Sequence, residues 1–387
     1  MRKIDFLNSI LKDKVDVGDA KTSKIKRSVL RKIFDKYLDV SESTNGKVMN
    51  INHCEGVISY SYQRHDLEFK SDNWLKFLYN YDCDVKNDGT FFSCGIASIS
   101  TLLTILIKHN YKNFVFTNVP YFESYDYLSN YFDAVNLKEI KYFHNNEKIK
   151  TDVLWIDSAS PDFLSLDYKN IDTKIIICDT SCLDCSNNYI KNLVDFVIKT
   201  NKQLFLVRSH MKLDCFSLEI NRLGSVVAIN DNEILTDVKE LKTKLGNNTT
   251  VQNIYPWLGN ADFFELTSKD VAYTNKINNL IESELRKILD TDKYDIVHFD
   301  HCMYFTIRLK KFEGDFNILN LSVSDYCKKF DLPVNTCSSF YLEKIGIDNF
   351  IRRLDNNSKF LRISSTKIKK KDAINIAKRV GEYLNSI

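Results

Sequence analysis

Residues 174–214 read KIIICDTSCLDCSNNYIKNLVDFVIKTNKQLFLVRSHMKLD, and this stretch decides the fold class. The isoleucine-rich run at its start is typical of a buried strand. Residues 189–200 then have the apolar spacing of an amphipathic helix, and the run at 203–209 predicts another strand. A strand, a helix and a strand in this order indicate parallel strands of an α/β domain.

The same alternation of short apolar runs and helices continues on both sides of this stretch. We expect strands at residues 113–119, 152–159 and 224–230, and helices at 98–109 and 124–132. The large domain is therefore predicted to be α/β with a mainly parallel sheet.

We predict three parts along the chain. Residues 1–70 form an N-terminal helical arm, residues 71–270 form the large α/β domain, and residues 271–387 form a smaller C-terminal α/β domain with a linking helix at 271–289. In the last part, apolar runs lie at residues 295–309, 332–342 and 359–365, and helical spacing lies at 369–387.

Composition excludes several function classes. The 387 residues include 54 basic and 51 acidic side chains, so the net charge of +3 gives no support to a nucleic-acid or membrane partner. No apolar run has the length of a membrane span. The basic start, MRKIDFLNSILKDKVD, lacks an uninterrupted apolar core and a cleavage site. We therefore expect a cytoplasmic protein whose ten cysteines stay reduced.

Polar residues follow each predicted strand of the large domain. In parallel α/β sheets, ligands gather at the carboxyl ends of the strands. The candidates are Tyr121, the segment 157–160, Asp179, and the segment 209–212 that ends in Lys212.

Five residues occur in the order that a pyridoxal phosphate site would need. Gly95 begins a helix in FFSCGIASISTLL, Tyr121 follows a strand, Asp179 ends a strand, Lys212 follows the next strand, and Arg362 lies in FLRISS. In such a site a lysine forms an imine with the aldehyde, and a carboxylate keeps the pyridine nitrogen protonated. A helix N-terminus binds the phosphate, an aromatic ring packs on the cofactor, and an arginine binds the substrate carboxylate.

Over roughly residues 60–387, the order of these motifs and their local sequences resemble those of the fold-type I pyridoxal phosphate enzymes. One branch is that of Cys/Met metabolism. YSYQRHD is similar to its Tyr-x-Arg element, which reaches the phosphate of a neighbouring subunit, and the matching residues are Tyr62 and Arg64. SCGIASIS is similar to its Ser-Gly-Met-Ala-Ala helix start, and ICDTS to its Asp-Asn-Thr. The resemblance implies cofactor contacts at Cys94, Gly95, Ile96, Tyr121 and Asp179.

The other branch is that of the class I/II aminotransferases. VRSHMKLDCFSLEINRLGSVV looks like their Arg-Ser-x-Ser-Lys segment followed by Arg-x-Gly. Here Ser209 would contact the phosphate, Lys212 would be the imine lysine, and Arg222 would be a further phosphate contact. The chain departs from both branches where Ser160 and Pro161 stand in place of Asn-Pro. It departs again where Met211 replaces the usual Ser or Thr before the lysine.

The resemblance implies a homodimer or a tetramer with shared active sites, and a free amino acid or a related amine as substrate. The reaction would pass through an external aldimine and a quinonoid, with Lys212, Asp179 and Tyr121 as catalytic residues and Arg362 on the substrate carboxylate. We favour aminotransferase-type chemistry from VRSHMK, RLG and TCSSF. A β- or γ-elimination or replacement enzyme is the alternative, from YSYQR, SCGIAS and Tyr121. A catalytically degenerate binding protein of the same fold is a second alternative.

Two groups of metal-ligating residue types are interpreted as structural. Cys182 and Cys185 form a C-x-x-C, but no second pair follows at matching spacing. His298, His301 and Cys302 lie in an alternating apolar run, where the two histidines would point to opposite faces of a strand. We therefore predict no metal site.

Overall fold

The computed structural model describes residues 3–11, 28–33, 49–53, 56–60, 67–117, 121–133, 135–139, 148–158, 170–216, 218, 220–231, 233–250, 253–297, 303–337, 339, 344–352 and 358–387. The chain divides into two compact units, residues Met1–Ser268 and Lys269–Ile387. The separate N-terminal arm over residues 1–70 stays a prediction.

The first 70 residues contain strands that the sequence analysis did not predict. Besides helix α1 (Lys3–Leu11) and a helical segment at 28–33, three antiparallel strands form a small sheet in the order β1-β2-β3. These are β1 (Met49–His53), β2 (Gly56–Tyr60) and β3 (Leu67–Lys70). Strands of four or five residues give too few alternations for a period of two to be read from sequence.

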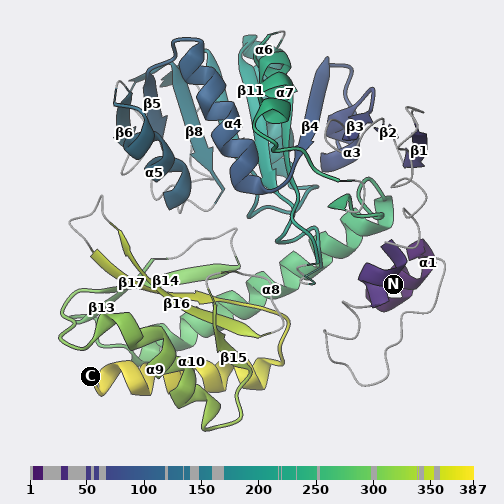
Figure 1. Cartoon of the computed structure of the whole chain (residues 1–387). Coiled ribbons are helices and arrows are strands. Elements are labelled where there is room, and N and C mark those ends of the chain that lie inside the picture. The colour runs from purple at the N-terminus through teal and green to yellow at the C-terminus, as the bar shows by residue number, and fades with distance from the viewer. Residues whose placement is uncertain are drawn as a thin grey trace. The chain divides into compact units, whose positions relative to one another are not determined.

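The central sheet of the first unit has seven strands in the order β4-β12-β11-β10-β8-β5-β6 (Figure 1). Strand β12 is antiparallel to both of its neighbours, and the other adjacent pairs are parallel. The mainly parallel sheet that the sequence predicted is therefore confirmed. The strands are β4 (Asn87–Phe92), β5 (Asn113–Phe116), β6 (Asn136–Glu139), β8 (Val153–Asp157), β10 (Ile175–Asp179), β11 (Gln203–Ser209) and β12 (Gly224–Ile229).

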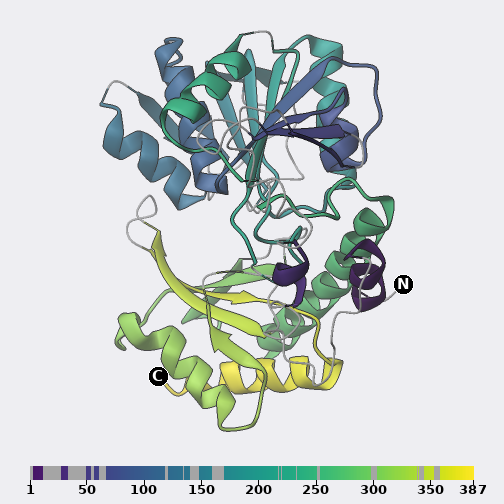
Figure 2. The same ribbon diagram turned by 45° about the vertical axis from the view of Figure 1, so that its right-hand side comes forward.

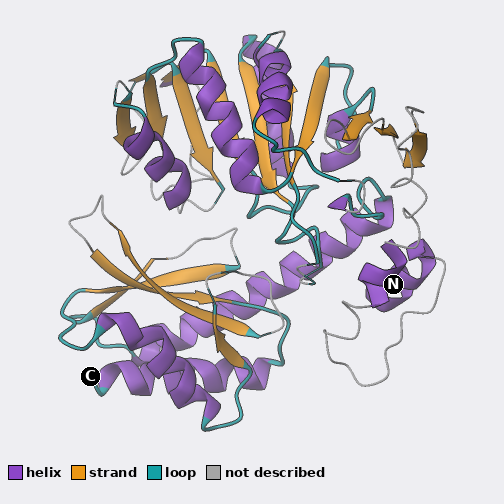
Figure 3. Cartoon of the chain, viewed as in Figure 1, coloured by secondary structure: helices purple, strands orange, loops and turns teal. Residues whose placement is uncertain are grey.

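Helices cover both faces of this sheet because its strands are apolar on both sides. Odd-numbered residues of β8 and β10, such as Trp155 and Ile177, pack in a core with α4, α5 and α7. Even-numbered residues, such as Ile156 and Ile176, pack in a second core with α3 and α6. Figure 3 shows the helices and strands of these layers. The helices are α3 (Trp74–Tyr79), α4 (Gly95–Lys108), α5 (Phe122–Tyr131), α6 (Asn188–Thr200) and α7 (Ile234–Lys244), and a short parallel pair is formed by β7 (Ile149–Lys150) and β9 (Ile171–Asp172).

Helix α8 (Ala261–Ile288) starts in the first unit and continues into the second. It begins ten residues before the predicted start at 271. The Asn260 side chain accepts a hydrogen bond from the backbone N–H of Asp262 at 2.8 Å, and this satisfies a donor of the first turn. The cap residue, which lies ahead of the apolar pattern, therefore sets the true boundary.

The second unit has a five-stranded sheet in the order β13-β14-β17-β16-β15, in which only the last pair is parallel. Figure 2 shows α9 and α10 side by side near this sheet. The elements are β13 (Tyr294–Val297), β14 (Tyr304–Leu309), a 3-10 helix (Phe316–Ile318), α9 (Leu319–Lys328), β15 (Val334–Thr336), β16 (Ile345–Arg352), β17 (Ser358–Ser364) and α10 (Lys370–Asn385). Among the described helices none is both long and apolar enough to cross a membrane.

Candidate functional site

Three polar side chains gather where parallel strands of the central sheet end. Asp157 on β8 and Asp179 on β10 are paired in register, and Asp179 is paired with Val207 on β11. Because side chains alternate along a strand, Asp157, Asp179 and Ser209 are directed to the face that α4 covers. The sheet therefore brings Asp179 and Ser209, which the sequence selected, to one edge.

The N-terminus of α4 lies against the same edge. A Cβ placed on Gly95 would lie 2.6 Å from the Cβ of Ser209, and a Cβ on Gly224 would lie 2.3 Å from the carbonyl oxygen of Cys94. Both positions require glycine because the backbones approach so closely. The side chain of Cys94 gives no capping hydrogen bond, so the first N–H groups of α4 lack that partner. This geometry suits an anion such as a phosphate, next to Ser209 and the exposed Ile96.

Asp179 is a buried carboxylate next to a cationic loop. It accepts a hydrogen bond from the backbone N–H of Ser181 at 2.8 Å. Burial raises the pKa of Asp179, although the hydrogen bonds from Ser181 and the positive charges of Arg208 and Lys212 oppose this rise. The positive charge of Lys212 therefore acts on the carboxylate of Asp179.

Asp157 is a second buried carboxylate, which the sequence analysis placed at a strand end but not in the site. It accepts a hydrogen bond from the backbone N–H of Tyr121 at 2.5 Å. The Tyr121 hydroxyl donates to Glu123 at 2.6 Å, and the ring is partly exposed. Burial, Glu123 and the charges of Asp179 and Asp157 raise the pKa of Tyr121 above its usual range. The backbone of Tyr121 thus lies next to the carboxylate of Asp157.

The loop that carries Lys212 is held by a buried polar network that the sequence did not reveal. The Arg208 guanidinium donates two hydrogen bonds to Asp214, from Nε and from Nη2, each at 2.7 Å. His210 contacts Asp214 through Nδ1 at 2.6 Å and Ser225 through Nε2 at 2.8 Å. Arg208, His210, Asp214 and Ser225 are each at most 1% exposed.

Arg208 also joins this loop to the turn after β10. Its Nη1 donates to the carbonyl oxygens of Thr180 at 2.5 Å and Leu183 at 2.9 Å. The Trp257 indole N–H donates to the carbonyl oxygen of Asp214 at 2.7 Å. The Arg208 side chain therefore links the turn after Asp179 to the loop around Lys212.

The network carries one charge of each sign. Burial opposes ionisation of both Arg208 and Asp214, but their mutual attraction raises the pKa of Arg208 and lowers that of Asp214. Burial lowers the pKa of His210 and outweighs the hydrogen bond and the negative charge of Asp214. At neutral pH His210 is therefore uncharged, so that Nδ1–H donates to Asp214 and Nε2 accepts from the Ser225 hydroxyl.

We predict that this buried histidine makes stability depend on pH. Below about pH 6.5, the usual histidine pKa, the unfolded chain binds a proton at His210 that the folded chain does not bind until a lower pH. The free energy of unfolding should therefore decrease as pH falls through this window, by at most about 1.4 kcal/mol per pH unit from this residue. Urea unfolding from pH 8 to pH 5 should show a shallower dependence in His210→Asn. Equal slopes in both proteins would contradict the assignment.

The two remaining arginine candidates lie in different units. Arg222 is exposed and lies two residues before Gly224, which pairs with Ser209, so its backbone is close to this edge of the sheet. Arg362 lies on β17 of the second unit, where its Nη2 is 3.1 Å from Asp348 Oδ2 and its guanidinium is 5.5 Å from the Tyr304 ring. Outside the described residues lie Tyr62, Arg64, Ser160, Pro161, His298, His301 and Cys302.

Three neighbouring cysteines of the first unit lie in the core. Cys178, Cys182 and Cys185 are buried free thiols, and burial raises the pKa of Cys178 and of Cys185 well above the usual value. Over the part of the chain that the structure describes, no group of three or more His, Cys, Asp or Glu residues is arranged to hold a metal.

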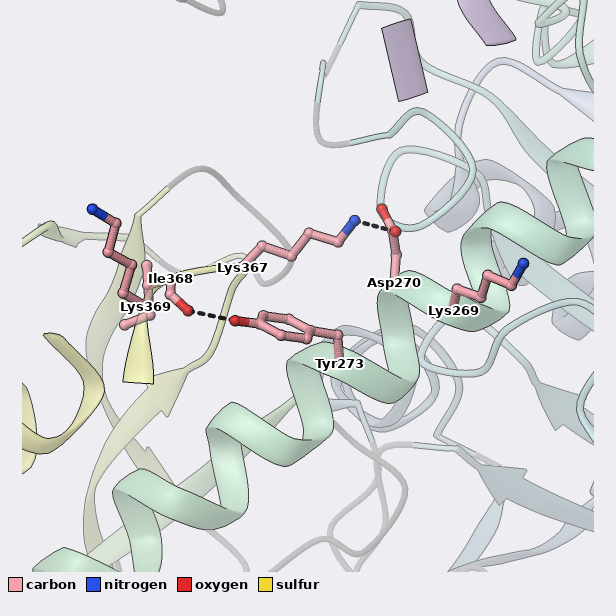
Figure 4. Close-up of a pocket in the computed structure, with 6 residues that line it drawn as sticks. All are labelled: Lys269, Asp270, Tyr273, Lys367, Ile368 and Lys369. Carbon is pink, nitrogen blue, oxygen red and sulfur yellow. Dashed lines mark hydrogen bonds and ion pairs between the residues drawn. The ribbon is translucent and has the colours of Figure 1, made fainter. Parts of the chain in front are cut away.

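An open depression of about 510 Å³ lies in the second unit and contains none of the predicted site residues. In Figure 4 the Lys367 ammonium is directed at the Asp270 carboxylate, and the Tyr273 hydroxyl donates to the carbonyl oxygen of Ile368 at 2.9 Å. The lining residues are Lys269, Asp270, Tyr273, Lys367, Ile368 and Lys369.

Solved structures share this fold over most of their length. The metB structure from Corynebacterium glutamicum is matched with a TM-score of 0.57 at 13% identity, over 84% of this chain and 88% of that one. Cystathionine gamma synthase from Xanthomonas oryzae pv. oryzae, in complex with cystathionine, is matched with a TM-score of 0.57 at 11% identity, over 81% and 84%. CalE6, a methionine gamma lyase from Micromonospora echinospora, is matched with a TM-score of 0.52 at 12% identity, over 76% and 80%.

At the level of sequence, no family model matches the chain. No curated protein matches it either. The structural matches confirm the predicted fold, which is that of fold-type I pyridoxal phosphate enzymes, at identities that establish the fold alone. The matched proteins include a gamma synthase and a gamma lyase.

Proposed function

We propose that this chain is a pyridoxal phosphate-dependent enzyme that eliminates or replaces a leaving group on the side chain of an amino acid. The observation that carries the proposal is the edge where Gly95, Ser209 and Asp179 meet and where the charge of Lys212 acts on Asp179. The names of the structural neighbours support the choice of elimination or replacement.

The residues of this edge fit the cofactor. The N-terminus of α4 lacks a side-chain cap and packs against Ser209, so it suits the phosphate. Asp179 is buried and held by Ser181, which suits a protonated pyridine nitrogen. Lys212 is the candidate for the imine. When bound, pyridoxal 5'-phosphate supplies an electron sink that acidifies the Cα hydrogen of an amino acid.

The chain's own residues would supply binding and proton transfer. Lys212 Nζ would take the Cα proton and deliver it to another substrate atom. Tyr121, held through its N–H by Asp157, would pack on the cofactor ring. Arg362 would bind the substrate carboxylate in exchange for its ion pair with Asp348. We further propose a homodimer or tetramer, in which Tyr62 and Arg64 contact the phosphate of a neighbouring subunit.

A substrate screen tests the proposal. The purified chain with pyridoxal 5'-phosphate is incubated with amino acids that carry a leaving group at Cβ or Cγ, and with matched amino acids that carry none. We expect release of ammonia and a keto acid from the first group without any added keto acid, because elimination needs no amino acceptor. Turnover that requires an added keto acid would instead identify an aminotransferase. Absence of both turnover and a visible imine band would favour the binding-protein alternative.

A further inference from the structure

The loop around Lys212 is held by hydrogen bonds between its own residues. Lys212 lies two residues after His210 and two residues before Asp214, and these two flanking side chains contact each other at 2.6 Å. Within the loop, the Cys215 thiol donates to the carbonyl oxygen of Met211 at 2.8 Å. The backbone on both sides of the lysine is therefore fixed by hydrogen bonds.

This closed loop is attached to the elements that form the rest of the candidate site. His210 donates its backbone N–H to the carbonyl oxygen of Leu223, the residue before β12, at 2.9 Å, and its Nε2 contacts Ser225 on β12. The neighbouring Gly224 packs on the N-terminus of α4. On the other side, Arg208 binds the carbonyl oxygens of the turn that follows Asp179.

We infer that Arg208, His210 and Asp214 form a buried clamp that positions Lys212 relative to Asp179 and the N-terminus of α4; this inference rests on the proposed function. Arg208 is directed to the face of β11 opposite to Ser209, and the buried side chains of His210 and Asp214 are bound to each other. They are positioning residues. They fix the position of Lys212, and Lys212 itself would form the imine with the cofactor.

The chemical composition of the clamp favours positioning over simple stabilisation. Two charges are removed from water here, and buried ion pairs are often no more stabilising than apolar side chains of similar volume. An arginine–carboxylate pair does, however, fix the relative orientation of its two side chains, since the guanidinium donates two parallel hydrogen bonds to the carboxylate. Arg208 donates two further N–H groups, both on Nη1, to carbonyl oxygens of the turn after β10, so it also fixes the distance between the two loops.

The test replaces the clamp by apolar side chains and follows Lys212. The double variant Arg208→Met/Asp214→Leu removes both charges together and leaves neither unpaired. We expect imine formation with added pyridoxal 5'-phosphate, followed by the visible band and by borohydride labelling of Lys212, to slow by about 100-fold, the scale of a misplacement of about 1 Å. Without cofactor, hydrogen exchange of the amides at 210–216 should become faster. Ser225→Ala, which removes one hydrogen bond of the clamp, should change both quantities in the same direction by a smaller factor.

A destabilised control separates positioning from stability. Leu193→Ala creates a cavity in the core beside α6 and touches no member of the clamp through a hydrogen bond. It should lower the urea midpoint while leaving the labelling rate of Lys212 in folded protein unchanged. Labelling at the wild-type rate in both clamp variants would overturn the inference, even if loop exchange were faster. If the wild-type chain itself gave no imine, the proposed function would fail instead, and the two failures are thereby distinguished.

Discussion

Replacement of Lys212 by alanine is expected to abolish covalent attachment of pyridoxal 5'-phosphate and to lower turnover by at least about 10³-fold, because one side chain supplies both the nucleophile and the proton-transferring base. Lys212 is partly buried, and its charge acts on the buried carboxylate of Asp179. The variant should still fold, since the hydrogen bonds that fix its loop come from His210, Asp214 and Cys215.

Borohydride reduction followed by peptide mass mapping checks this result. The pyridoxyl mass should appear on Lys212 in the wild-type chain and on no peptide of Lys212→Ala. Lys202→Ala is a matched control, because Lys202 precedes the opposite end of the same strand and donates to the carbonyl oxygen of Thr173 at 2.6 Å. Labelling should be unaffected in that variant. A pyridoxyl mass on any other lysine of the wild-type chain would refute the assignment.

The central sheet was readable from sequence because its strands are buried on both faces. The strand predicted at 203–209 is β11 with the same bounds, and the strand predicted at 224–230 differs from β12 by one residue at its end. The isoleucine-rich run that starts at residue 174 is β10. Such strands are continuous apolar runs, and they stand out against the spacing of the helices between them. The strands of the small sheet β1-β2-β3 are short and do not form continuous apolar runs, so the sequence did not predict them.

Only part of the candidate site could be predicted from the sequence, because the pairing of the buried clamp residues depends on the three-dimensional structure. Gly95, Asp179 and Lys212 follow or precede apolar runs, so their place at the sheet edge follows from topology. The sequence predicts only that the segment 209–212 is polar and follows a strand, and charged residues such as Arg208 and Asp214 are rarely buried unless paired. Their pairing depends on which face each side chain takes in three dimensions. The sequence VRSHMKLD does not show whether its polar side chains are exposed to solvent or buried.

The remaining large effect is expected at Asp179. Asp179→Asn keeps the shape of the side chain and the Oδ1 acceptor for the Ser181 N–H, but it removes the negative charge. A neutral amide no longer holds the proton on the pyridine nitrogen by a charge-assisted hydrogen bond. We expect turnover to decrease on the order of 100-fold, which corresponds to about 2.7 kcal/mol of lost transition-state stabilisation. Steady-state kinetics on protein with full cofactor occupancy, checked by absorbance, measures this loss.

Asp157→Asn is the matched control for this variant. Asp157 is equally buried, lies in register with Asp179 on the next strand, and also accepts a backbone N–H, that of Tyr121. The amide oxygen of asparagine can accept that N–H as well, so the control removes the same charge from the same edge without removing the proposed partner of the ring nitrogen. A clearly smaller decrease is expected there. If both variants lost activity equally, the effect at Asp179 would reflect the charge of the edge as a whole. If Asp179→Asn kept wild-type turnover with cofactor bound, its role at the pyridine nitrogen would be excluded.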